Sequence, residues 1–287
     1  MKYDEKIVGR VCETLVSSGS TFSPDKIRAY EKAILNETND QAKWAMKAIL
    51  ENALVARKNR SPLCDDTGIP HLILEVGPDM VLTGNMMESI KEGIRQGLRK
   101  LPGRPMAVKG DDYRRIDQSL GMSEDPADLD AAPILIRNVE ENVMKLHILM
   151  LGGGPAIRGK TYRIFHKHNV QTVLDEIILW AKEGTTMLGC TPCTLAVGVG
   201  RSHYEASSMM LQALVDGNYD RQSDMEKEIT AQVNSLGVGP LGLGGDTTVL
   251  ATFMKVGPQR ASGVRVVCMR PCCCVEPRIA TVDLSKK

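Results

Sequence analysis

The sequence predicts a mixed α/β or α+β fold in which helices pack against mixed sheets. Segments with apolar residues at helical spacing alternate along the chain with short apolar runs of strand length. The 287 residues are 43% hydrophobic and 25% charged, which is typical of a globular chain rather than a disordered one. Because neither an internal repeat nor a clear boundary divides the sequence, we expect one domain over residues 1–287.

The first 60 residues are predicted to be helical. Ser23, Pro24 and Asp25 form the pattern of an N-cap, a proline in the first turn and an early acid. Apolar residues then recur at helical spacing as far as Ile34, and a second helix is predicted over about 41–57. That helix carries Trp44, which we expect in the core, as we do Trp180 of a later helix.

The rest of the chain alternates between predicted strands and helices. Strands are predicted over residues 71–76, 133–139, 143–151, 195–199, 249–256 and 264–267. Helices are predicted over residues 86–100, 170–182, 203–215 and 223–236. The long connection over 101–131 is rich in Pro, Gly and Asp, which is typical of a functional or mobile loop.

Charge and composition exclude several classes of function. The net charge of +1 argues against a general role in binding nucleic acid or a membrane surface. The sequence contains no apolar run of about 18 residues, and its N-terminus lacks the apolar core of a signal peptide. We therefore expect a cytoplasmic protein, in which the eight cysteines are better explained as metal or cluster ligands than as disulfides.

The cysteines occur in three short motifs. In Pro62–Gly68 a thiol, Cys64, stands beside Asp65 and Asp66, and a bound cation would favour its thiolate. Cys190-Thr-Pro-Cys193 is compatible with zinc, a redox dithiol or a single cluster ligand. In the run Cys272–Cys274, side chains alternate, so only one or two can face a given site. Each motif also has an alternative interpretation without a ligand. Residues 62–68 could be an Asp-rich turn, Cys190 and Cys193 two buried thiols, and Cys272–Cys274 part of an incidental surface tail.

Two glycine-rich segments, 152–154 and 237–245, could bring the backbone close to a ligand. Such segments present N–H groups to anions, although neither has the pattern of a P-loop or of a dinucleotide fingerprint. Turn geometry without any ligand is the alternative interpretation.

The order of these motifs resembles that of the α subunit, or N-terminal half, of class I iron–sulfur fumarate hydratases and L(+)-tartrate dehydratases. Pro62–Gly68 resembles the family's Cys-x-Asp-Thr-Gly segment, and residues 190–214 resemble its second cysteine with the strand and helix that follow. Residues 234–250 resemble its long signature, Asn-x-Leu-Gly-x-Gly-Pro-x-Gly-Leu-x-Gly-x-Thr-Thr. The similarity extends over about residues 25–278.

The resemblance implies a [4Fe–4S] cluster held by three cysteines, with one iron open to the substrate. The matching positions are Cys64, Cys190 and Cys272, counted from the glycine signature. Counting back from Arg278 gives Cys274 as the alternative third ligand. Thiolates suit iron–sulfur clusters, and an incompletely ligated iron is a catalytic rather than a structural arrangement.

The resemblance also assigns roles near the cluster. Asp66 matches the acid that gives a proton to the hydroxyl group, and the backbone of Gly153 and Gly154 matches a contact to a substrate carboxylate. Asp65 stands where the family has Gln, so it places a further charge beside an anionic substrate. Arg115, or its neighbour Arg114, is a candidate carboxylate clamp, although a solvated surface pair explains it equally well.

We therefore expect the α subunit of a hydro-lyase that hydrates or dehydrates a small dicarboxylate of the fumarate/malate or tartrate type. A separate β subunit would complete the site, and the resemblance implies a dimer of heterodimers. One alternative is a zinc-binding protein that uses Cys190, Cys193 and the Cys272–Cys274 run. Another is a non-catalytic assembly or regulatory subunit. Departures from the family pattern favour it: besides Asp65, Pro155 and Ala156 stand where fumarases have Ser-Glu, and Arg260 stands where the family has His.

Overall fold

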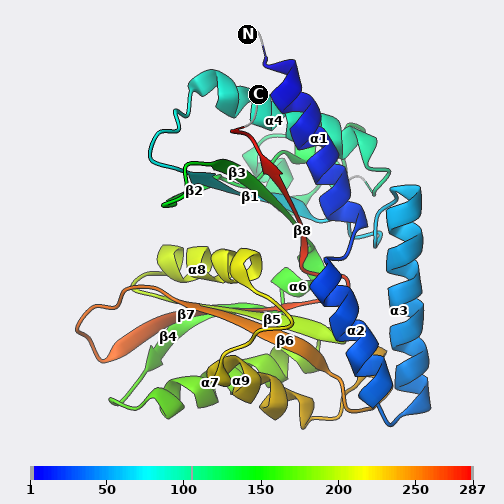
Figure 1. The fold of residues 1–287 in the computed structure, drawn as a ribbon, viewed down its shortest axis with the longest axis vertical. Helices are drawn as coiled ribbons and strands as arrows, with labels where there is room; N and C mark the ends of the chain where they lie inside the picture. The colour runs from blue at the N-terminus through cyan, green and yellow to red at the C-terminus, as the bar shows by residue number, and fades with distance from the viewer. Residues whose placement is uncertain (1–2, 105, 286–287) are drawn as a thin grey trace. The chain divides into compact units, whose positions relative to one another are not determined.

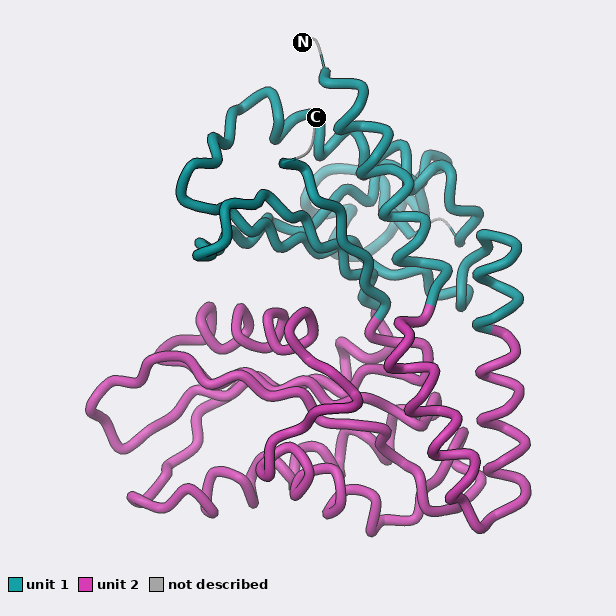
Figure 2. Tube along the Cα trace, in the orientation of Figure 1, with its two compact units in different colours: residues 1–21, 53–152, 278–287 teal, residues 22–52, 153–277 magenta. Residues whose placement is uncertain are grey.

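The structure, a computed structural model, describes residues 3–104 and 106–285. The chain divides into two compact units, each built from separate stretches of sequence (Figure 2). Unit 1 comprises residues 1–21, 53–152 and 278–287, and unit 2 comprises residues 22–52 and 153–277. A four-stranded sheet with packed helices occurs in each unit, which confirms the predicted fold class.

The sheet of unit 1 has the strand order β2-β1-β3-β8. Strand β1 (Ile69–Val76) pairs in parallel with β2 (Leu135–Asn138) and antiparallel with β3 (Met144–Leu151), and β8 (Arg278–Asp283) pairs antiparallel with β3. In Figure 1, helices α1 (Glu5–Ser20) and α4 (Gly84–Lys100) lie side by side over one face of this sheet.

A close approach of two helices explains why α4 contains glycine. A Cβ atom at Gly93 would lie 2.6 Å from the Cβ atom of Val11 on α1, so a larger residue would push the helices apart. The core beneath them is aliphatic and includes Leu15, Leu72, Ile94 and Ile148. The long connection of this unit contains the short helix α5 (Asp112–Asp117) and the 3-10 turn η1 (Pro126–Leu129).

The sheet of unit 2 has the strand order β4-β7-β5-β6. Its strands are β4 (Lys160–Phe165), β5 (Cys193–Gly200), β6 (Val249–Val256) and β7 (Val264–Cys272). Strands β5 and β6 are parallel, and the other pairs are antiparallel. Helices α7 (Val170–Thr186) and α9 (Asp224–Asn234) cover one face, and α8 (His203–Asp216) covers the other (Figure 1). Gly198 allows α8 this contact, because a Cβ there would lie 2.1 Å from the carbonyl oxygen of Ala206.

The remaining elements are helices and turns, most of which belong to unit 2. Helix α2 (Pro24–Asn36) belongs to unit 2, and helix α3 (Asp40–Asn59) passes from unit 2 into unit 1. Ser23 occupies the N-cap position of α2 as predicted, although its side chain makes no capping hydrogen bond. The short helix α6 (Gly153–Ala156) and the 3-10 turn η2 (Pro240–Gly242) complete the set.

The expectations for Trp44 and for the end of β7 differ from the structure, and β4 and β8 lie outside the predicted strands. Trp44 is 67% exposed on α3, where Ala42, Ala45 and Met46 fill the buried positions instead, whereas Trp180 is buried as expected. Strand β7 continues to Cys272 rather than ending at residue 267, so the first cysteine of the triplet belongs to the sheet. Among the described helices, none combines the length and the apolar character that crossing a membrane requires.

Candidate functional site

The first cysteine motif forms a loop of unit 1 between α3 and β1. Cys64 is half-buried, and its thiol donates a hydrogen bond to the carboxylate of Asp65 over 3.3 Å. The guanidinium of Arg104 lies 3.4 Å from the same carboxylate. The hydrogen bond from Cys64, together with the backbone N–H of Asp66 and the charge of Arg104, lowers the pKa of Asp65. The loop therefore carries a charged carboxylate in direct contact with the thiol.

A buried arginine, Arg278, holds the backbone of this loop by hydrogen bonds. Arg278, the first residue of β8, donates from Nη1 to the carbonyl oxygen of Asp66 over 2.8 Å and from Nε to that of Met150 over 3.0 Å. Gly68 has a φ of +83°, and a Cβ there would lie 2.7 Å from Nη2 of Arg278. The backbone of the candidate acid Asp66 is thus held by a residue more than two hundred positions away in the sequence.

The second and third cysteine motifs meet in unit 2. The backbone N–H of Cys274 donates to the carbonyl oxygen of Cys190 over 2.8 Å. Cys190 is exposed, Cys273 is half-buried and Cys274 is almost fully buried. A hydrogen bond with Cys273 and burial together raise the pKa of the Cys274 thiol. The two motifs are therefore adjacent although more than eighty residues separate them.

The other thiols of unit 2 lie in its interior. Cys272 is fully buried at the end of β7, where burial raises its pKa and Arg270 donates a hydrogen bond to it. Arg270 also pairs with the buried carboxylate of Glu276 over 3.0 Å. Cys193 belongs to the aliphatic core, and burial raises its pKa to about 12. These environments oppose thiolate formation in the free chain.

The glycine-rich segment supports the Cys190 turn. The hydroxyl of Thr191 donates to the carbonyl oxygen of Gly239 over 2.5 Å, and the N–H of Leu241 donates to that of Thr191 over 3.0 Å. The sequence predicts that such a segment presents N–H groups to an anion. In the structure, the N–H groups of Asp246 and Thr247, directly after it, bind the carboxylate of Glu37, an anion of this chain.

The remaining predicted residues stand on two short helices, α6 and α5. Gly153 and Gly154 begin α6, and a Cβ at either would meet nothing within 4 Å. Arg115 is exposed on α5 and pairs with Asp112 of the same helix. Arg104 is the guanidinium that the structure places beside the Cys64 loop, and sequence reasoning missed it. Its only local signal was a Gly-Arg-Pro sequence in the long connection.

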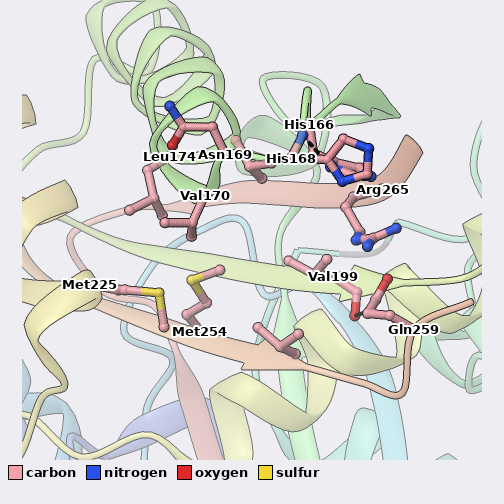
Figure 3. Close-up of a pocket in the computed structure, with 12 residues that line it drawn as sticks. His166, His168, Asn169, Val170, Leu174, Val199, Met225, Met254, Gln259 and Arg265 are labelled. Carbon is pink, nitrogen blue, oxygen red and sulfur yellow. Dashed lines mark hydrogen bonds between the residues drawn. The ribbon is translucent and has the colours of Figure 1, made fainter. Parts of the chain in front are cut away.

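Unit 2 also contains an apolar pocket of about 350 Å³, shown in Figure 3. Its walls include Val170, Leu174, Val199 and Met254. Val199 lies six residues along β5 from Cys193, which corresponds to about 20 Å of extended strand. The described residues that line the pocket include no Cys, Asp or Glu, so the pocket is separate from the cysteine motifs.

The zinc hypothesis requires several ligand side chains that converge on one point. Within residues 3–104 and 106–285, no group of three or more His, Cys, Asp or Glu side chains is arranged to hold a metal ion, and this applies to the cluster ligands as well as to zinc. Cys193 in particular packs into the core of unit 2, whereas Cys190 faces solvent. The cysteine arrangement therefore gives no support to a zinc site built from Cys190, Cys193 and the triplet.

Comparison with known proteins decides the family. The model of the fumarate hydratase (Fumerase) family matches residues 9–283. The chain belongs to this family. One relative of the chain is a protein of Methanocaldococcus jannaschii, provisionally named L(+)-tartrate dehydratase subunit alpha. It is 26% identical over 282 residues, which cover 92% of this chain and 93% of the relative.

Two further relatives extend the comparison. The L(+)-tartrate dehydratase subunit alpha of Escherichia coli K12 is 22% identical over 262 residues, covering 88% of this chain and 83% of its own length. A protein of Geobacillus stearothermophilus, provisionally named fumarate hydratase class I, is 27% identical over 267 residues. That match covers 88% of this chain but 50% of the relative, so this fumarate hydratase family member corresponds to half of that protein.

Proposed function

We propose that this chain is the α subunit of an iron–sulfur hydro-lyase that adds water to, or removes it from, a small dicarboxylate or hydroxydicarboxylate. The observation that carries the proposal is the family match over residues 9–283, which includes all three cysteine motifs. The relatives' names supply the reaction class, since tartrate dehydratases and fumarate hydratases both cleave or form a carbon–oxygen bond.

We further propose that a separate β subunit completes the enzyme, as a dimer of heterodimers. Two observations support a partner. Relatives of similar length carry the name subunit alpha, and the chain matches half of the provisionally named fumarate hydratase. We propose the cytoplasm as its location, where a reducing environment keeps thiols available as ligands.

The donor set fits a [4Fe–4S] cluster, because thiols are the ligands that such clusters require. We propose Cys64, Cys190 and Cys274 as the ligands. We favour Cys274 over Cys272 because its backbone bonds to that of Cys190, whereas the Cys272 thiol is enclosed and bound by Arg270. When bound, the cluster supplies a Lewis-acidic iron that polarises the substrate hydroxyl.

The chain's own groups supply the remaining chemistry that we propose. Asp66 gives a proton to the departing hydroxyl, and Arg278 fixes the backbone that carries it. The N–H groups of Gly153 and Gly154 bind a substrate carboxylate. Asp65 adds a negative charge next to the substrate, and its ion pair with Arg104 offsets that charge. Arg115 remains a candidate clamp that must exchange its Asp112 partner for the substrate.

Metal analysis of the full chain after anaerobic reconstitution tests this proposal. We expect about four iron and four sulfide per chain. Cys64→Ala, Cys190→Ala and Cys274→Ala should each lower that content. Cys272→Ala should retain it and serves as the matched control, since this thiol directly neighbours the triplet's other members. One equivalent of zinc without sulfide would support the zinc alternative and overturn the proposal.

Activity separates the enzyme from a non-catalytic subunit that keeps the fold. The reconstituted chain is combined with a candidate β subunit and assayed with fumarate, malate and tartrate. We expect turnover of at least one dicarboxylate, and Asp66→Asn should abolish it without lowering the iron content. A full cluster with no turnover of any of them would instead support an assembly or regulatory subunit.

A further inference from the structure

Helix α2 holds the third cysteine motif through two buried side chains that sequence analysis did not connect with it. Lys26 and Tyr30 stand one helical turn apart, so both project from the same face. The Tyr30 hydroxyl donates to the carbonyl oxygen of Cys274 over 2.8 Å, and Nζ of Lys26 donates to that of Glu276 over 2.6 Å. Both side chains are 0% exposed.

An aromatic contact fixes the two donors. The Tyr30 ring stacks on Phe22 with centroids 5.6 Å apart, and Nζ of Lys26 lies 4.2 Å from the Phe22 centroid. Burial lowers the pKa of Lys26 to about 8, and the nearby thiols and Glu276 oppose that decrease. A buried ammonium is unfavourable by itself, so packing alone would be served better by an apolar residue.

Both backbone polar groups of Cys274 are hydrogen-bonded. Its N–H group donates to Cys190, and its carbonyl oxygen accepts from Tyr30. The following residues are fixed in the same way, because the N–H of Glu276 donates to Cys273 and its carboxylate pairs with Arg270. Without the two α2 donors, the carbonyl groups of Cys274 and Glu276 would be left buried without these partners.

We propose that Lys26 and Tyr30 are positioning residues that hold the Cys272–Glu276 segment so that Cys274 stays beside Cys190 before any cofactor binds. The Lys26 ammonium also places one positive charge against the backbone of this segment, at the carbonyl oxygen of Glu276, where it offsets the negative charge of a thiolate-ligated cluster. The second part rests on the proposed function, whereas the first concerns the cofactor-free chain.

Hydrogen exchange of the reduced, cofactor-free full chain tests the positioning role. Tyr30→Phe removes a single oxygen atom and keeps the ring stack, so the variant should fold. We expect the amides of the Cys272–Glu276 segment to exchange roughly tenfold faster, which corresponds to about 1.4 kcal/mol. Tyr204→Phe, at an exposed position of α8, is the matched control and should leave this segment unchanged. Wild-type exchange in Tyr30→Phe would overturn the positioning role.

The reduction potential of the reconstituted cluster tests the charge. Lys26→Met should lower the midpoint potential, because a nearby positive charge stabilises the reduced form. Lys26→Arg should restore most of it, and Lys32→Met, which removes an exposed charge from the same helix, should not shift it. An unchanged potential in Lys26→Met would refute the charge role. If the wild type takes up no cluster, the proposed function and the charge role both fail, while the exchange experiment still decides the positioning role.

Discussion

Glu37 ties the end of α2 to the glycine-rich segment, and its replacement should destabilise unit 2. The carboxylate is 2% exposed and accepts hydrogen bonds from four backbone N–H groups, those of Thr38, Asn39, Asp246 and Thr247. A hydrogen bond to a charged group contributes roughly 1.5–3 kcal/mol. Glu37→Gln keeps an acceptor in place of Oε1 but turns an NH₂ group toward the N–H of Thr247. We therefore expect a loss of about 2–3 kcal/mol, and about 3–5 kcal/mol for Glu37→Ala.

Urea unfolding followed by tryptophan fluorescence measures this loss in the right unit. The chain's two tryptophans, Trp44 and Trp180, both belong to unit 2, so the signal reports that unit. With a slope of about 2 kcal/mol/M, Glu37→Gln should lower the midpoint by roughly 1–1.5 M urea. Glu31→Gln, at an exposed position of α2, is the matched control. Equal midpoints for the two variants would refute the reasoning.

Three further predictions concern packing, pH and the candidate acid. Gly198→Ala forces a Cβ to within 2.1 Å of a carbonyl oxygen of α8 and should destabilise unit 2 by about 1–3 kcal/mol, whereas Gly153→Ala, which has open space, should change the urea midpoint little. Burial opposes the charge of Glu75, but the hydrogen bonds and charges of Arg137 and a histidine outweigh it and lower its pKa below 4.5. Its stabilisation is therefore present above about pH 4.5 and lost as the pH falls through the lowered pKa. Glu75→Gln should therefore flatten the stability profile below about pH 4.5, and identical slopes would contradict this. Arg278→Met removes the donor that holds the Asp66 carbonyl. We expect kcat of the assembled enzyme to fall by a larger factor than its iron content, and a wild-type kcat would disprove this.

The predicted elements agree with the structure wherever the apolar pattern is strong. Two strands have no counterpart among the predicted ones, β4 (Lys160–Phe165) and β8 (Arg278–Asp283). Strand β4 shows why the rest is harder. It is an edge strand with one buried residue, Ile164, so its sequence carries little apolar alternation. Trp44 shows the converse, because the size of an apolar side chain does not determine whether its helix face is covered.

The candidate site divides in the same way. Cys64, Cys190 and the triplet stand in motifs that are visible in sequence, so their motifs could be found without a structure. Lys26 could not, because its partner Glu276 lies 250 residues away and a lysine near a helix start gives no local signal of burial. The sequence predicts that residues 237–245 present N–H groups to an anion, whereas the fold shows the next two residues, Asp246 and Thr247, donating to the carboxylate of Glu37.

The interleaving of the two units sets the order in which a nascent chain can complete them. Unit 2 has all of its residues once position 277 has been synthesised, whereas unit 1 still lacks the strand β8. Domains tend to fold as units during synthesis, and the backbone hydrogen bond between Cys274 and Cys190 needs no residue of β8. The Cys64 loop becomes fixed only when Arg278 emerges and binds the carbonyl of Asp66. Of the three proposed ligands, the cysteine of unit 1 is therefore the one whose loop depends on the C-terminal strand β8.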